Sequence, residues 1–216
     1  MDRRLHRRLP RDYTAGVGNG DLFVSLWIME VYLLRHTHTA WGRGICYGAT
    51  DVPLRQEAES DLVQAVQKLT TATTAPLPII SSPLSRCRLL AEQFGRPYTT
   101  DARLVEMNFG DWEGLAWNEI PPENLQPWMQ DFANLPTPNG ESMRDVYARV
   151  LHFWNEFTQT HTTDHLIVTH GGVIRSLVCH CLQIPLEMAF RFELEWGSLT
   201  KITIKGDLAT VNFLNR

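Results

Sequence analysis

Three short segments of this 216-residue chain carry side chains that can hold and attack a phosphate group. Arg35 and His36 follow one apolar run, Arg86 comes shortly after a second, and His170 and Gly171 follow a third. Arginine guanidinium groups bind phosphate oxygens through paired hydrogen bonds. The N–H groups of a helix that begins after Gly171 supply further donors for an anion. These residue types predict a site for a small-molecule phosphate monoester.

The predicted site forms only if the apolar runs are neighbouring strands, because residues beyond the carboxyl ends of parallel strands face one crevice. Runs with the character of strands lie at 30–35, 78–81, 165–169, 198–204 and 208–214. Apolar residues at helical spacing or helix-like segments lie at 55–70, 84–94, 141–157 and from 171 to about 182. This alternation predicts an α/β fold, a three-layer α/β/α sandwich with a mostly parallel central sheet.

Length and charge bound the organisation and the partners. A chain that is 44% hydrophobic over this length can bury one substantial core, so we expect a single domain over residues 29–216. The formal net charge of −4 gives no basic surface for nucleic acid, and no stretch reaches transmembrane length. We expect neither nucleic acid nor a membrane as a partner, and the sequence leaves the oligomeric state open.

Cysteine usage favours a reducing, cytoplasmic location. The chain has four cysteines without a CxxC pair, too few for a disulfide framework at this length. They are Cys46, Cys87, Cys179 and Cys181.

Residues 1–28 differ in character from the rest. Several arginines and a glycine-rich stretch precede the apolar run 22–29, which superficially resembles a signal peptide. The glycine-rich stretch separates the charges from the apolar run, and no small-residue cleavage site follows. We expect a disordered extension, or a native chain that begins at Met29.

A metal-dependent hydrolase of the amidohydrolase type is the main alternative. His36 and His38 alternate along the chain, and such a pair on one face of a strand can hold Zn²⁺. Two observations disfavour this: an eight-fold barrel needs about 250 residues, and Arg35 adjoins the first histidine. Because no carboxylate cluster for Mg²⁺ accompanies the strand ends either, we predict no metal and no cofactor.

The segment 106–140 is predicted to cap the site. It combines several prolines with Trp112, Trp117 and Trp128 and lacks clear periodicity. Trp112 or Trp117 is a candidate to stack on a base or sugar of the substrate. Isolated histidines are expected to be structural, with His152, His161 and His165 at the surface.

The strand-end motifs resemble those of the histidine phosphatase superfamily, which includes phosphoglycerate mutases. The motifs are Leu33–Thr37, Ser81–Arg86 and Val168–Gly172. The alpha-ribazole phosphatase branch is the closest match, through Glu106–Gly114, Pro138–Ser142, and Cys46–Gly48 with Thr50 and Asp51. The resemblance covers about Val31 to Ile204 and implies a phosphoglycerate mutase-like fold.

The resemblance also implies roles. His36 is the expected nucleophile, kept unprotonated by the adjoining arginines, and Glu106 is the expected acid and then base. Arg35, Arg86 and His170 are expected to neutralise the phosphoryl oxygens.

Secondary phosphate contacts are expected from Thr39 and the backbone at Gly171. Thr37, His38 and Gly42 depart from the usual family pattern. Thr37 replaces a glycine, His38 stands where a glutamate or another polar residue is usual, and Gly42 replaces an asparagine that helps to hold phosphate.

The expected activity is hydrolysis of a phosphate monoester through a phosphohistidine intermediate. The resemblance names alpha-ribazole 5'-phosphate, or a cobalamin 5'-phosphate precursor, as the substrate, in assembly of the cobalamin nucleotide loop. A broad sugar or nucleotide phosphatase, a phosphoglycerate mutase and an inactive binding module remain as alternatives. The mutase is disfavoured because Met107, Asn108 and Phe109 stand where mutases place an arginine and a tyrosine, and the retained site residues disfavour the inactive module.

Overall fold

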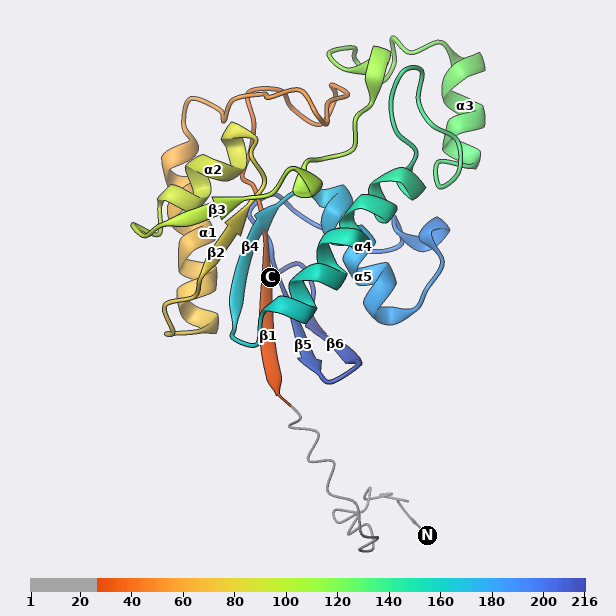
Figure 1. Cartoon of the computed structure of the whole chain (residues 1–216). Coiled ribbons are helices and arrows are strands. Elements are labelled where there is room, and N and C mark those ends of the chain that lie inside the picture. Colours follow the sequence, from red (N-terminus) through yellow and green to blue (C-terminus); the bar gives the residue numbers. More distant parts are fainter. Residues whose placement is uncertain (1–26) are drawn as a thin grey trace, which may run out of the picture.

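The computed structural model describes residues 27–216, so the expectation for residues 1–28 lies almost entirely outside the described part. A six-stranded sheet with the order β3-β2-β4-β1-β5-β6 forms the centre of the molecule (Figure 1). Its strands are β1 (Ile28–Arg35), β2 (Ile79–Ser81), β3 (Tyr98–Thr100), β4 (His165–Thr169), β5 (Leu199–Lys205) and β6 (Leu208–Phe213). Strands β1 to β4 pair in parallel, whereas β5 pairs antiparallel with both β1 and β6.

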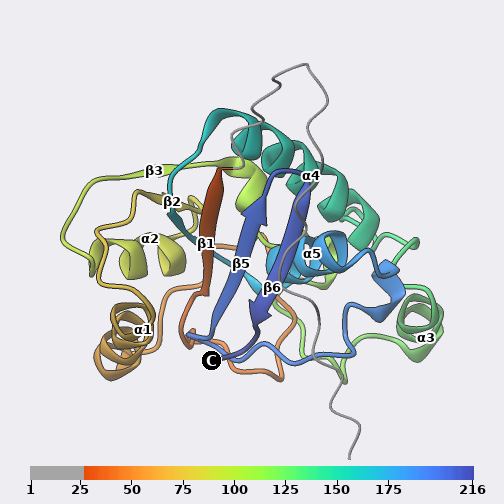
Figure 2. The same cartoon turned by 90° about the horizontal axis from the view of Figure 1, so that it is seen from below.

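Helices cover both faces of the sheet, which gives the predicted three-layer sandwich (Figure 2). The helices are α1 (Ala58–Ala72), α2 (Ser85–Glu92), α3 (Pro122–Gln130), α4 (Met143–Thr160) and α5 (Gly171–Leu182). Successive residues of a strand face opposite sides. Val31 and Leu33 of β1 therefore pack with α4 and α5, whereas Tyr32 and Leu34 pack with α1 and α2. No helix among residues 27–216 has the length and apolar character to cross a bilayer.

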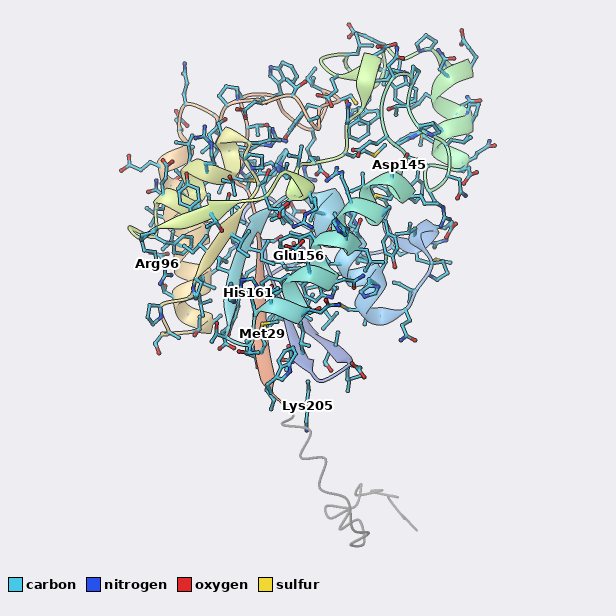
Figure 3. All side chains as sticks on the ribbon, in the orientation of Figure 1. Met29, Arg96, Asp145, Glu156, His161 and Lys205 are labelled. Atoms are coloured by element: carbon cyan, nitrogen blue, oxygen red, sulfur yellow. The ribbon has the colours of Figure 1, made fainter. Side chains whose placement is uncertain are left out.

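Helix α4 begins where its sequence provides a reciprocal cap. The Ser142 hydroxyl accepts the Asp145 N–H, and the Asp145 carboxylate accepts the Ser142 N–H at 2.9 Å. This pairing satisfies two backbone donors that the first helical turn leaves free. Figure 3 shows Asp145 near the start of α4, with Glu156 and His161 toward the opposite end.

Segment 106–140 is more ordered than the sequence predicts. It contains α3 and a short 3₁₀ helix, η2 (Gly110–Trp112), and has a small apolar cluster around Cys46, Trp112 and Ile120. Figure 1 places α3 beyond the end of the sheet toward which β1 and β4 run. We call this segment the cap segment.

Three details differ from the sequence expectations. Helix α1 begins at Ala58 rather than at residue 55, and the short edge strand β3 was not predicted. His165 is not at the surface: it is 4% exposed and packs edge-on against Phe157, with ring centroids 5.1 Å apart. It is buried because it begins β4, an interior strand whose face toward α4 is covered.

Candidate active site

Sheet pairing brings the three predicted strand ends together. Strand β4 lies between β1 and β2, and its last residues pair with Arg35 and Ser81. The His36 N–H donates to the Thr169 carbonyl at 3.0 Å, and the Ser82 N–H donates to the Val168 carbonyl at 2.9 Å. Backbone hydrogen bonds therefore place His36 and Ser82 on either side of His170.

The two histidine rings lie close together and are buried. Their centroids are 5.1 Å apart, and His36 and His170 are 1% and 0% exposed. His36 Nδ1 lies 2.7 Å from the Thr37 carbonyl oxygen. Because a carbonyl oxygen only accepts, this contact requires the proton on Nδ1. His36 Nε2 then carries a free lone pair, which is what a nucleophile needs.

Burial and neighbouring charge keep both rings neutral. Burial is the largest cause that holds the pKa of His36 well below 6.5, and Arg86 and Arg35 lower it further. The pKa of His170 is lowered well below the same value, first by burial and then by Arg86, His36 and Arg35. From the sequence, only the arginines were expected to lower the pKa of His36.

Arg86 forms part of the floor of the site. It is 0% exposed, and its Nη1 and Nη2 donate to the carbonyls of Thr50 and Gly48 at 2.8 and 2.5 Å. Gly48 is required there, because a Cβ on it would lie 1.7 Å from the Met107 carbonyl oxygen. The loop that carries Gly48 and Thr50 can thus pack directly against the backbone at Met107.

Two buried arginine donors remain available for a ligand. Within residues 27–216, neither Arg35 Nε nor Arg86 Nε has a hydrogen-bond acceptor. An unsatisfied buried donor costs about 1–3 kcal/mol. An anion that accepted a hydrogen bond from one of these donors would relieve the cost at that position.

Glu106 is held at the start of α5. The Gly172 N–H lies 3.0 and 3.1 Å from its two carboxylate oxygens, and the Met107 N–H donates to Oε1 at 3.0 Å. The positive end of the helix dipole favours a carboxylate at this position. A Cβ on Gly172 would lie 2.3 Å from Glu106 Oε1, so glycine is needed for this approach.

A cavity of about 240 Å³ joins these groups. One end contains Arg35, His36, Glu106 and the backbone at Gly171 and Gly172. The rest of its wall is mainly apolar and aromatic, with two further arginines. Residues of this wall include Phe109, Trp117, Phe190, Trp196, Arg43 and Arg175.

Comparison with known proteins assigns the chain to a family. The sequence model of the histidine phosphatase superfamily (branch 1) matches residues 31–216. The chain belongs to the histidine phosphatase superfamily. It is a phosphoric monoester hydrolase, as the sequence analysis predicted.

Two relatives and one solved structure show the range of similar proteins. Adenosylcobalamin/alpha-ribazole phosphatase of Salmonella typhimurium is 30% identical over 197 residues, which cover 87% of this chain and 96% of that protein. Glucosyl-3-phosphoglycerate phosphatase of Mycolicibacterium vanbaalenii is 30% identical over 177 residues, covering 74% and 77%. The structure of alpha-ribazole phosphatase from Shigella flexneri superposes with a TM-score of 0.76 at 28% identity, covering 87% of this chain and 96% of that one.

Not every predicted residue of the histidine phosphatase site lines the cavity. Arg86 and His170 lie beneath its surface, fully buried. The Thr39 hydroxyl donates to the Trp41 carbonyl at 2.6 Å and lies 2.8 Å from the Tyr47 hydroxyl. Its expected contact with phosphate stays a prediction, since what the structure shows is support for Tyr47, which does line the cavity.

Two of the three unusual loop residues, His38 and Gly42, also have definite positions. His38 Nδ1 lies 2.9 Å from Asp61 Oδ2, and its ring packs on Trp196 with centroids 4.4 Å apart. It therefore engages Asp61 instead of joining His36 as a pair of ligands. Gly42 is exposed, with open space where a Cβ would stand. Among residues 27–216, no group of three or more His, Cys, Asp or Glu side chains could hold a metal ion.

The residues that line the cavity but were not predicted from the sequence include Arg43, Tyr47, Arg175 and Trp196. A usable signal existed for Arg175, because it lies one helical turn after Gly171 and so faces the same side of α5. The other three stand on loops, where no periodicity indicates direction.

Proposed function

We propose that this phosphatase hydrolyses alpha-ribazole 5'-phosphate, or a cobalamin precursor with the same phosphate, through a phosphohistidine on His36. One observation carries the proposal: a single cavity joins the free Nε2 of His36 and the Glu106 carboxylate to aromatic walls. Alpha-ribazole combines a ribosyl phosphate with an aromatic base, and aromatic side chains bind such bases by stacking.

In the first step, His36 Nε2 attacks phosphorus in line with the leaving oxygen. The P–N bond forms as the P–O bond breaks, and the electron pair of that bond passes to the leaving oxygen. Glu106 gives its proton to this oxygen. Arg35 and Arg86 stabilise the phosphoryl oxygens, and the Thr37 carbonyl stabilises the imidazole as it becomes cationic.

In the second step, water attacks the phosphohistidine. The Glu106 carboxylate, now ionised, removes a proton from this water. The new P–O bond forms as the P–N bond breaks, and the electron pair returns to His36 Nε2. Inorganic phosphate leaves, and both residues regain their starting protonation states.

Aromatic residues of the cap segment support a binding site for the base. Trp117 lines the cavity and is supported by Phe109, edge-on at 5.7 Å, and by Trp128, stacked at 6.2 Å between ring centroids. Trp112 does not share this position. It is 4% exposed and packs against Trp128, so its role is structural, and Trp117 is our candidate for stacking.

The test is kcat/KM measured across a panel of esters. The panel contains alpha-ribazole 5'-phosphate, ribose 5-phosphate, nucleoside monophosphates, phosphoserine and 3-phosphoglycerate. Stacking one base contributes about 1–3 kcal/mol, so alpha-ribazole 5'-phosphate should exceed ribose 5-phosphate by about 10- to 100-fold. Equal values for these two esters would contradict the proposal.

A second candidate substrate class is an ester whose leaving group bears a carboxylate. Arg43 and Arg175 both line the cavity beyond the phosphate end, and a cation there suits an anionic leaving group. Arg175 packs over the Phe190 ring, with its guanidinium carbon 4.6 Å from the ring centroid. The same panel decides: a preference for phosphoserine or 3-phosphoglycerate that Arg175→Met abolishes would support this class.

A further inference from the structure

The loop that carries Glu106 is tied to α4 by an ion pair outside the cavity. Arg149 of α4 and Glu141, just before that helix, form two parallel hydrogen bonds, Nε to Oε1 at 2.8 Å and Nη2 to Oε2 at 3.0 Å. Glu141 Oε2 also accepts the N–H of Asn108 at 2.8 Å. The Glu141 carboxylate therefore connects the arginine to the backbone two residues after Glu106.

The same guanidinium holds the backbone at and before Glu106. Arg149 Nη1 donates to the carbonyls of Arg103 and Val105 at 2.8 and 2.6 Å. Its Nη2 donates to the carbonyl of Glu106 itself at 3.1 Å. Only the planar fork of an arginine can reach these carbonyls and a carboxylate together.

Glu106 stands on the loop of residues 105–109, which we call the acid loop and which has little other regular structure to fix it. The 3₁₀ helix η1 (Ala102–Leu104) precedes Glu106 and η2 begins at Gly110, so Glu106 lies on irregular backbone between them. Arg149 makes no hydrogen bond to the Glu106 carboxylate, which is held instead by the N–H groups of Met107 and Gly172. Arg149 can therefore act on that carboxylate through the position of the loop or through its charge, and a lysine at this position keeps the charge alone.

We propose that Arg149, paired with Glu141, is a positioning residue that sets the Glu106 carboxylate at the leaving oxygen. The inference rests on the proposed role of Glu106 as general acid. Displacing an acid by about 1 Å can cost about 10²-fold in rate. The loss appears only with leaving groups that need a proton, because an aryl oxide departs without one.

The experiment compares kcat/KM for ribose 5-phosphate and for 4-nitrophenyl phosphate on each protein. Because both values come from one preparation, their ratio is independent of the fraction that is folded. Arg149→Met should lower the alkyl-to-aryl ratio by about 10- to 100-fold. Arg149→Lys should lower it nearly as much, since lysine keeps the charge but lacks the fork; a wild-type ratio in Arg149→Lys would overturn the proposal.

Arg103→Met is the matched control. Arg103 lies in η1, just before the acid loop, and its own carbonyl accepts from Arg149. Its side chain forms ion pairs with Asp101 and Glu156, at 2.6 and 2.7 Å, and does not bind the carbonyls of the acid loop. Its loss should leave the ratio within about twofold of wild type. A drop as large as that of Arg149→Met would show that any disturbance of this segment suffices, and would overturn the assignment to Arg149.

Glu106→Gln separates failure of this inference from failure of the proposed function. A selective loss in Glu106→Gln with an unchanged ratio in Arg149→Met would refute positioning and leave the acid role standing. Equal losses on both esters in Glu106→Gln would refute the acid role itself. If the acid role of Glu106 and the positioning role of Arg149 both hold, the variant that carries Glu106→Gln and Arg149→Met should have the alkyl-to-aryl ratio of Glu106→Gln alone, because the two residues act through one proton transfer. A further drop in that ratio would contradict the proposal.

Discussion

The two ends of the cavity are built by different physical means. At the phosphate end, His36, Arg86 and His170 are at most 1% exposed. The two histidines directly follow strands of the sheet, and Arg86 lies in the first turn of α2. The leaving-group wall is contributed mainly by the 41–47 loop, the cap segment and the loop before β5, together with Met143 of α4 and Arg175 of α5. Its Phe190 is 59% exposed. The comparison indicates that phosphate binding and nucleophilic attack depend on the sheet and on the helices that follow its strands, whereas substrate choice depends mainly on loops that can change without disturbing the sheet.

Arg35→Met gives the largest effect and tests whether the phosphate end serves every substrate equally. Loss of one preorganised donor to the transferring group should lower kcat/KM by about 10²- to 10³-fold. Because all phosphate esters share that group, the factor should be nearly the same for each member of the panel.

Arg43→Met is the corresponding variant on the leaving-group wall, to be compared with Arg35→Met at the phosphate end. Arg43 is 67% exposed and paired with Glu195, so its loss should cost less than about tenfold and differ between esters. Losses for Arg35→Met that differ by more than tenfold between esters would remove the distinction between the two ends.

The next largest expected effect is on stability, because the buried histidines make the free energy of unfolding depend on pH. The pKa values of His36 and His170 are lowered in the folded state, so below pH 6.5 the unfolded chain binds more protons than the folded one. The free energy of unfolding should therefore fall as pH drops below 6.5, by at most about 1.4 kcal/mol per pH unit for each histidine.

Denaturant unfolding between pH 7.5 and pH 5, in the wild type and in His36→Asn, measures this contribution. The variant should show a shallower decline, because one of the two buried rings no longer takes part. The exposed His152 provides the control, and His152→Asn should keep the wild-type slope. Identical slopes for all three proteins would show that His36 is not held neutral by the fold.

Trp117→Leu gives the smallest effect and probes the wall. Leucine keeps most of the apolar area, so the loss should be only the aromatic contribution of about 0.5–1.5 kcal/mol, or about 2- to 10-fold in kcat/KM. It should appear with alpha-ribazole 5'-phosphate and not with ribose 5-phosphate. Met129→Ala, a change on the exposed side of α3, controls for general loosening of the cap segment; a uniform loss with Trp117→Leu would rule out contact with the base.

The phosphate end of the cavity could be predicted from the sequence better than the leaving-group wall. Strand periodicity and the order of the motifs predicted the sandwich and the meeting of Arg35, His36 and His170, because parallel strands bring their ends together whatever the loops do. No comparable rule predicts the direction in which a side chain on a loop points. Arg43 and Trp196 were therefore missed, although the cavity is partly theirs.

Burial and long-range hydrogen bonds were the other limits. His165 was expected at the surface because a polar residue beside a turn usually lies there, but the strand order places it in the interior. Arg149 and Glu141 are eight residues apart, yet their partners lie more than thirty residues earlier in the chain. Such contacts exist only in the folded structure, so no local pattern marks them.

The most direct test of the central claim is to locate the phosphoryl group during turnover. Wild-type protein is mixed with ³²P-labelled ribose 5-phosphate, quenched in alkali within one turnover and digested for mass spectrometry, with His36→Ala treated in parallel. The account predicts an acid-labile phosphoryl group on His36 of the wild type and none on the variant, which should not turn over. Phosphoryl label on His170 in the wild type, or continued turnover by His36→Ala, would contradict it.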